Sequence, residues 1–196
     1  MKNASKQSAW LTIPTLVLLA HPLQAQVWPP QPEWHLGVEV GSTQLDVSEE
    51  DFRIYQSDTS FGVRAGWSVT SNVDLVAGYL DMGRFDTVLF EDEVDEDGDT
   101  RRVVGGFRTS SATAWTAHAE LNYELFGFLH PSVGLGVARW RLDIPDGQHS
   151  DTQDTAPILR LAVGFELGGN TRLDISAQRI GRLDARSGGL TLRFDF

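Results

Sequence analysis

Cysteine is absent from this 196-residue chain, which excludes disulfide bonds and thiolate metal sites. Lysine is almost absent, because Lys2 and Lys6 are the only two and every later basic residue is an arginine. After residue 25, no hydrophobic run approaches the roughly 20 residues that a transmembrane helix needs. If this chain spans a membrane, it must do so as a closed β-barrel, because an open sheet would leave edge hydrogen bonds unmet in lipid.

Positive charge is also scarce. The chain has 16 Lys and Arg residues against 27 Asp and Glu residues, which gives a formal net charge of −11. Such an acidic chain repels phosphate backbones, so we expect no nucleic-acid partner. The sequence offers no cofactor-binding pattern either, and we expect no cofactor.

The N-terminus has the layout of a secretory signal peptide. Lys2 and Lys6 form a short basic region, an apolar run follows at 9–20, and Leu23-Gln24-Ala25 resembles a cleavage site. We therefore predict a signal peptide at 1–25 and a proline-rich lead-in at 26–33, where prolines disfavour a central strand. Residues 34–196 are predicted to form one domain.

Eight segments of this domain have strand character. Each has roughly ten residues, which suits a tilted strand that crosses a bilayer. The predicted strands are Trp34–Gln44, Thr59–Val69, Val73–Phe85, Thr109–Leu125, Leu129–Leu142, Pro157–Leu167, Arg172–Leu183 and Leu190–Phe196.

The connections between these strands alternate in length. Short links at 70–72, 126–128 and 168–171 follow the second, fourth and sixth strands, whereas longer polar segments at 45–58, 86–108 and 143–156 follow the first, third and fifth. Outer-membrane barrels have short periplasmic turns and longer external loops. The sequence therefore predicts an all-β fold, an eight-stranded antiparallel up-and-down transmembrane barrel.

Alternation along the strands predicts which side chains face lipid. A soluble lipocalin-like barrel also alternates but turns its apolar face inward. Here one parity is apolar and the other combines glycine with charge, and small residues suit the narrow lumen of an eight-stranded barrel. The apolar parity is therefore predicted to face lipid. It contains Trp34, Leu36, Val38, Val40, Phe61, Val63, Ala65, Trp67, Trp115, Ala117, Leu121, Leu159, Leu161, Val163 and Phe165. The parity of the fifth strand stays open, and the third loses its alternation after Tyr79.

Aromatic residues gather at both ends of the predicted strands, as expected for rings at the headgroup level of a membrane. Trp34, Trp67, Phe126, Phe128, Phe165 and Phe194 lie near the short turns, and Phe61, Phe85 and Trp140 lie near the long connections.

Ionisable residues of the inward parity form the candidate site. Buried charges must be paired, so these residues are predicted to form either a fixed plug of ion pairs or a network that rearranges to open an ion path. The candidates are Glu39, Arg64, His118, Glu120, Arg160, Glu166, Arg172, Asp174, Arg193 and Asp195.

The acidic segment 91–99 is a weak metal candidate. Glu93, Asp95 and Asp97 imitate the first positions of a calcium loop, but Val104 stands where a bidentate glutamate is required. A solvated acidic loop is the competing interpretation. Loose association with divalent cations would let this loop bridge to an anionic lipid surface.

A catalytic reading depends on His130 and Ser132. Lipid A deacylases present a His and a Ser two residues apart on one strand, but here Pro131 intervenes and the pair lies at the short-turn end, away from the outer leaflet. No third, orienting group can be assigned from the sequence. We predict that the protein is not an enzyme.

The strand at Val73–Tyr79 after a tight turn, the glycine-rich fifth and sixth strands and the final strand at Gly189–Phe196 resemble the OmpA-like family of eight-stranded outer-membrane barrels. The resemblance covers 34–196 and implies residence in the Gram-negative outer membrane. It also implies an assembly signal in Phe194 and Phe196, recognised by the outer-membrane assembly machinery. The peptidoglycan-binding domain of longer family members is not found here.

The function implied is a non-catalytic, structural or surface-interaction role, as a monomer in contact with outer-membrane lipid and lipopolysaccharide. Three alternatives stay open: a small porin or ion-permeable channel, a lipid A-modifying enzyme and a soluble periplasmic barrel.

Overall fold

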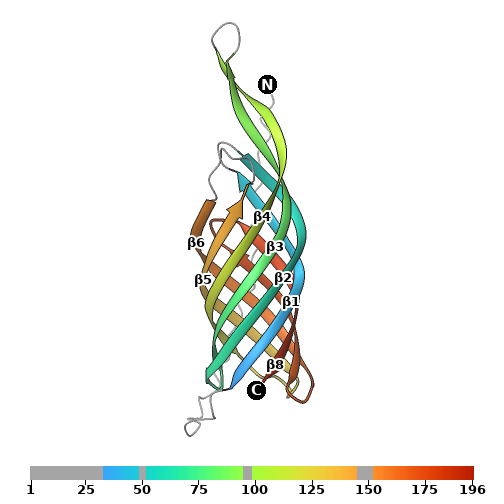
Figure 1. Ribbon diagram of the computed structural model, residues 1–196. Helices are drawn as coiled ribbons and strands as arrows, with labels where there is room; N and C mark the ends of the chain where they lie inside the picture. Colours follow the sequence, from blue (N-terminus) through green and yellow to red (C-terminus); the bar gives the residue numbers. More distant parts are fainter. Residues whose placement is uncertain (1–32, 49–51, 95–98, 145–151) are drawn as a thin grey trace, which may run out of the picture.

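The structure, a computed structural model, describes residues 33–48, 52–94, 99–144 and 152–196. Eight antiparallel strands follow one another around a closed barrel, and β8 closes the ring by pairing with β1 (Figure 1). The strands are β1 (Trp34–Ser48), β2 (Phe52–Thr70), β3 (Val73–Val94), β4 (Thr100–Asn122), β5 (Leu129–Asp143), β6 (Thr152–Gly168), β7 (Thr171–Ile180) and β8 (Ala185–Asp195). The predicted fold class is confirmed. The predicted signal peptide lies outside the described residues, as does the lead-in apart from Glu33.

The three short turns lie together at one end of the barrel, and the strand ends that border the predicted long connections lie at the other (Figure 1). The prediction of long loops was wrong in detail, because much of each polar segment is strand. β3 and β4 form a hairpin that reaches to Val94 and Thr100 and projects beyond the other strands. The polar residues there belong to the solvent faces of paired strands, so polarity alone was a poor guide to loop boundaries. The final strand likewise begins at Ala185 instead of Leu190.

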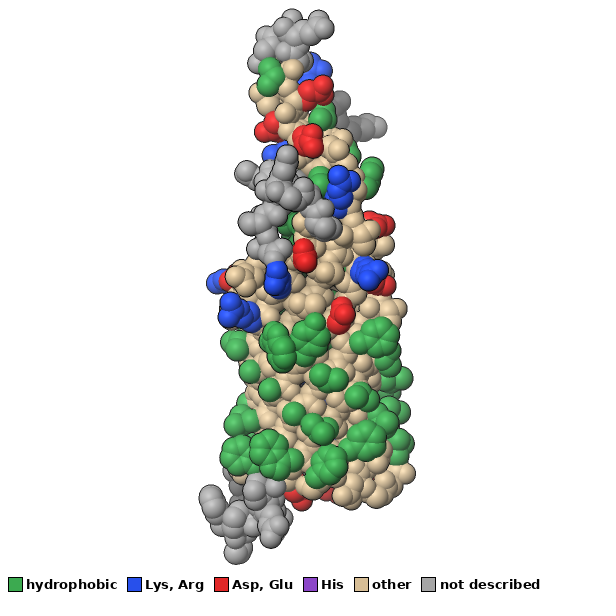
Figure 2. All heavy atoms as spheres, viewed as in Figure 1, with side chains coloured by type: hydrophobic (Ala, Val, Ile, Leu, Met, Phe, Trp, Pro, Cys, Tyr) green, Lys and Arg blue, Asp and Glu red, His purple; other side chains and the backbone are tan. Residues whose placement is uncertain are grey.

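A belt of apolar side chains surrounds the half of the barrel that carries the short turns (Figure 2). Leu36 is 53% exposed, Phe61 60% and Leu161 50%, although all three are large hydrophobic residues. The predicted lipid-facing parity is therefore the outer face of the barrel. On β5, where parity was open, Val133, Leu135 and Val137 face outward.

In the other half of the barrel the apolar residues change sides. Large hydrophobic side chains point inward and are almost completely buried, whereas the outer face of the same strands is polar. This arrangement is that of a water-soluble barrel, with its apolar core inside. The residues of this inner core, the outer-half core, are Leu45, Phe52, Ile54, Leu80, Met82, Phe85, Leu89, Ala112, Ala114, Ala138, Trp140, Leu142, Ile144, Ala156, Ile158, Ile180, Leu183 and Ala185.

The change of sides corrects two aromatic assignments. Phe85 is 0% exposed and Trp140 is 6% exposed, so neither lies in a lipid-facing girdle. The aromatic residues on the lipid side at that level include Tyr79 and Trp115, whose ring centroids are 5.0 Å apart. At the short-turn end, Trp34 stacks on Trp67 at 5.9 Å, as the predicted girdle requires.

No helix within residues 33–48, 52–94, 99–144 and 152–196 is long and apolar enough to cross a membrane.

Candidate functional site

Alternation places the candidate charges inside the belt-bearing half of the barrel, where they form two buried clusters. The first is centred on Glu120 of β4, which is 1% exposed. Arg64 of β2 donates from Nη2 to Oε2 of Glu120 at 2.6 Å, and the Ser132 hydroxyl donates to Oε1 at 2.6 Å. His118 Nε2 lies 3.4 Å from the same Oε2. Three strands are thus joined through one carboxylate.

Arg160 of β6 extends this cluster across the lumen. It is 2% exposed and is among the largest fully buried side chains. Its Nη2 donates to the Thr191 hydroxyl at 3.3 Å and lies 3.8 Å from Oε2 of Glu39. The Thr191 hydroxyl in turn donates to Glu39 at 3.2 Å. Arg160 therefore links β6 to β1 and β8, strands from opposite ends of the chain.

The second cluster lies nearer the short turns and is centred on Asp74 of β3. Arg193 donates from Nη1 to Oδ2 of Asp74 at 3.1 Å and from Nε to Asp195 at 2.6 Å. Asp74 also accepts hydrogen bonds from Ser68 at 2.7 Å and from the amide of Asn122 at 3.0 Å. A carboxylate with these three donors is fully engaged, as a buried charge must be.

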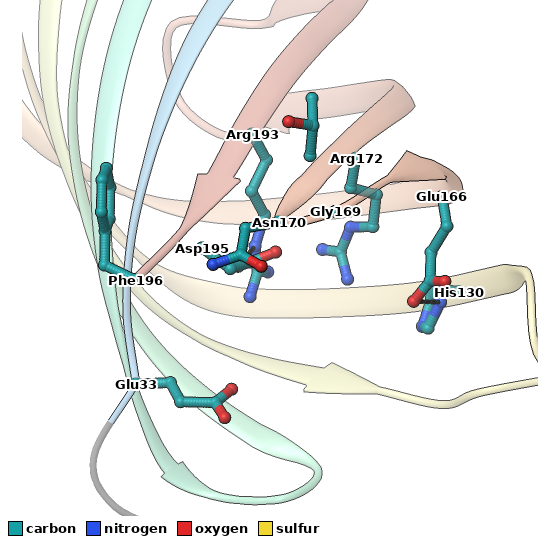
Figure 3. A pocket seen from close by; sticks show the side chains of 10 residues that line it. Glu33, His130, Glu166, Gly169, Asn170, Arg172, Arg193, Asp195 and Phe196 are labelled. Carbon is teal, nitrogen blue, oxygen red and sulfur yellow. Dashed lines mark hydrogen bonds and ion pairs between the residues drawn. The ribbon is translucent and has the colours of Figure 1, made fainter.

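Glu166 and Arg172 line the mouth at the short-turn end, where a hollow of about 290 Å³ opens (Figure 3). Arg172 donates to Asp174 on the same strand at 2.8 Å, and both are buried. His130 lies 3.2 Å from Glu166, whose side chain is 54% exposed. Glu166 is therefore a rim residue and does not join the buried clusters.

Four buried polar residues of this region were not among the charge candidates named from the sequence. Asp74, Thr191, Ser132 and His35 are all buried and face inward. Parity would have identified Asp74 and His35, since they alternate with the lipid-facing residues. His35 lies so close to Gly66 on β2 that a Cβ there would meet the imidazole Nε2 at 2.0 Å. Glycine at 66 is required by this close approach.

The clusters leave little room for water. The cavity between Glu39, Arg64, His118 and Arg160 measures about 20 Å³, which is enough for about one water molecule. Nη1 of Arg64 and Nη1 of Arg160 have no hydrogen-bond partner among the described residues. On the side of this cavity away from the short turns, a hydrogen bond of 2.9 Å joins Thr43 to Ser187. The outer-half core lies beyond that hydrogen bond.

The proposed catalytic pair does not form a nucleophile and base. The His130 imidazole contacts Glu166, whereas the Ser132 hydroxyl donates to Glu120, so the two side chains bind different carboxylates. Across the described part of the chain, no group of three His, Asp or Glu side chains could hold a metal ion. Of the metal candidates, Glu93 lies in β3 one residue before its end, and Asp95 and Asp97 lie outside the described residues.

Three solved structures share this architecture. The N-terminal β-barrel domain of Pseudomonas aeruginosa OprF matches 85% of this chain and 100% of its own, with a TM-score of 0.54 and 15% identity. The P. aeruginosa outer membrane protein OprG matches 84% and 96%, with a TM-score of 0.59 and 11% identity. The outer membrane protein AlkL matches 87% and 92%, with a TM-score of 0.51 and 18% identity. Neither protein-family models nor curated protein sequences give a match.

Proposed function

Since the chain has the eight-stranded fold of the OmpA-like outer-membrane barrels, we propose that it resides in the outer membrane of a Gram-negative bacterium as a non-catalytic barrel with a closed interior. Its role in this proposal is structural or surface-directed, carried out by the β3–β4 hairpin that projects beyond the belt. The last strand would serve as the assembly signal: Phe194 and Phe196 both face outward, and the Phe196 amide donates to the Trp34 carbonyl at 2.8 Å.

The filled interior carries the proposal. Two paired charge clusters occupy one half of the lumen, and the outer-half core occupies the other. An ion would have to leave its hydration shell to pass both layers, and a layer of packed apolar side chains offers it no ligands. This arrangement favours a plug over the small-porin alternative.

Conductance measurements test this proposal. We expect the purified protein in planar bilayers to show no steady ion conductance, because the cavity in the middle of the lumen holds about one water. The control is a variant that weakens the outer-half core by replacing Met82 and Phe85 with alanine. Stable unitary currents from the wild-type barrel would contradict the closed interior and support the porin alternative.

A second candidate function is binding of a small apolar molecule inside the outer half. Its basis is the indole Nε1 of Trp140, which is buried in the outer-half core and has no hydrogen-bond partner among the described residues. A buried N–H without a partner is costly, and a ligand oxygen would satisfy it.

A seam between β2 and β3 would give such a molecule access from the side. Their backbone ladder stops between Ile54 and Phe61 of β2, and side chains bridge the gap. Asp58 accepts from the Arg84 amide at 2.6 Å, and Gln56 accepts from the Asp86 amide. Backbone hydrogen bonds from Arg84 and then Thr59 hold the pKa of Asp58 below its ordinary value, so it stays charged at neutral pH. Saturable quenching of tryptophan fluorescence by an apolar probe, lost in Trp140→Phe, would support this function.

A further inference from the structure

The short-turn end of the barrel opens into a polar hollow that the buried charge clusters do not fill. This hollow of about 290 Å³ shares four of its lining residues with a second hollow of about 340 Å³, and the shared residues are Glu33, His130, Arg172 and Arg193. Figure 3 shows Arg172 and Arg193 reaching into the first hollow from neighbouring strands. We call the two hollows together the mouth pocket. Its size is that of a site for a small molecule.

Arg172 presents an unpaired edge to the mouth pocket. Its side chain is only 9% exposed, and its Nε donates to Oδ1 of Asp174 at 2.8 Å. Gly164 on the next strand makes room for this side chain, since a Cβ at 164 would lie 2.8 Å from Cδ of Arg172. Nη1 and Nη2 of Arg172 have no hydrogen-bond partner among the described residues. These two atoms form an edge through which a guanidinium binds a carboxylate by two parallel hydrogen bonds.

A second guanidinium stands beside the first. Arg193 of β8 is directly opposite Arg172 of β7, and both side chains face inward. Arg193 donates from Nε to Asp195 and from Nη1 to Asp74, so its Nη2 has no partner among the described residues. Like charges that face each other across two strands are destabilising, and an anion that contacts both would relieve the repulsion. The floor of the mouth pocket is therefore a site for a carboxylate.

The rim of the mouth pocket has the opposite charge. Glu33 and Glu166 line the first hollow, Glu124 lines the second, and all three are exposed. Among the described residues of the short-turn end, every exposed charged side chain is one of these glutamates. An acidic rim attracts cations and repels simple anions on approach. A ligand that carries both an ammonium and a carboxylate would satisfy the rim and the floor together.

We infer that the mouth pocket binds short peptides as zwitterions, with the carboxylate on Arg172 and the ammonium at Glu33 and Glu166. Neither glutamate forms an ion pair with Arg172, so the two charges of the ligand must lie apart, as they do in a peptide. The ligand would not pass through the barrel, because the cavity in the middle of the lumen holds about one water. The site lies at the opposite end from the β3–β4 hairpin, so this binding is additional to the surface role proposed above.

Titration with three related peptides tests the inference. The probes are triglycine, N-acetyl-triglycine, which lacks the ammonium, and triglycine amide, which lacks the carboxylate. The protein is the purified full chain in phospholipid nanodiscs, and binding is followed by NMR shifts of its backbone amides. We expect triglycine to bind about tenfold more tightly than either blocked peptide, because each blocked peptide loses one charge-assisted interaction. The shifts should be largest at 169–172 and 193–196, around the mouth pocket.

A floor variant tests the carboxylate site. Arg172→Gln/Asp174→Asn removes the guanidinium together with its aspartate, so no buried charge is orphaned. We expect this variant to bind triglycine about tenfold more weakly, at the level of triglycine amide. Triglycine binding equal to that of wild type would overturn the inference.

A rim variant tests the ammonium site without touching the interior. Glu33→Gln/Glu166→Gln should bind triglycine no more tightly than wild type binds N-acetyl-triglycine, and its own binding of N-acetyl-triglycine should not weaken. The matched control, Asp92→Asn/Glu93→Gln, removes two acidic charges from the β3–β4 hairpin and should bind triglycine like wild type. Equal binding of all three peptides to wild type, or no shifts around the mouth pocket, would overturn the inference. Tighter binding of triglycine amide than of triglycine would also overturn it, because the acidic rim would then act alone.

Discussion

Replacing Glu120 with leucine is expected to lower the free energy of unfolding by about 3–5 kcal/mol. The substitution removes the acceptor for Arg64, whose Nη2 is bonded to Glu120 at 2.6 Å and whose side chain is 8% exposed. The guanidinium would remain charged and buried without its partner. Urea unfolding of the barrel in phospholipid vesicles, followed by tryptophan fluorescence, measures the change.

Two controls separate this effect from loss of bulk or charge alone. Glu124→Leu removes an exposed carboxylate at the short turns and should change stability by less than about 0.5 kcal/mol. The double variant Arg64→Met/Glu120→Leu should recover part of the loss, because an apolar pair of similar size leaves no orphaned charge. If Glu120→Leu were as stable as wild type, the cluster would not be a plug held by paired charges.

Phe85→Ala is expected to cost about 3–5 kcal/mol, the range found for large-to-small changes in a packed interior. Phe85 is 0% exposed and packs in the outer-half core, although the sequence had placed it at the membrane surface. The matched control is Phe107→Ala on β4. Phe107 is 68% exposed on the projecting hairpin, so its loss should change stability by less than about 0.5 kcal/mol.

The same unfolding experiment measures both phenylalanine variants. Similar costs at the two positions, or a larger cost at Phe107, would mean that the apolar residues beyond the belt do not form an interior core. The comparison keeps the side chain and the substitution constant and changes only the environment.

The sequence was a good guide to the belt and a poor one to the region beyond it. Trp34, Leu36 and Val38 alternate with His35 and Gly37, so period and polarity together identified the lipid face. Further along β1, Leu45 and Val47 belong to the opposite parity and face inward. Along each strand the surroundings of the barrel change from lipid to water. The inward-facing residues change correspondingly from polar, inside the belt, to apolar beyond it. Alternation by itself does not mark where that change occurs.

On β3 a local irregularity made it harder to assign residues to the inner or the outer face from the sequence. Leu80 and Met82 face inward, and so does Phe85, three residues later. The extra residue is taken up at Gly83, where the register with β4 shifts and φ is 100°. A bulge of this kind reverses the parity of every following residue. The loss of alternation after Tyr79 therefore reflects the bulge. The sequence alone did not show which residues after the bulge face the lumen and which face outward.

The sequence predicted which charged residues face the lumen but not which of them pair with one another. Parity selected the right residue types, and seven of the buried polar residues had been named from it: Arg64, His118, Glu120, Arg160, Arg172, Asp174 and Arg193. Their partners depend on the register of strands far apart in the chain. Arg193 bonds to Asp74 across 119 residues, and Thr191 bonds to Glu39 across 152. Nothing local in the sequence specifies such pairs.

The change of sides along the strands also fixes how deeply the barrel can sit. If the molecule sank toward the short-turn end, Arg139 and Asp81 would enter hydrocarbon, and an arginine near the bilayer midplane costs about 2–4 kcal/mol. If it rose, Phe61 and Trp115, at the opposite edge of the belt, would leave lipid for water. On each strand, the point at which the apolar residues change from the outer face to the inner face marks the expected membrane surface. A bilayer thicker or thinner than the apolar belt would therefore have to deform around this protein. Movement of the barrel along the membrane normal would improve the match at one edge of the belt only by worsening it at the other.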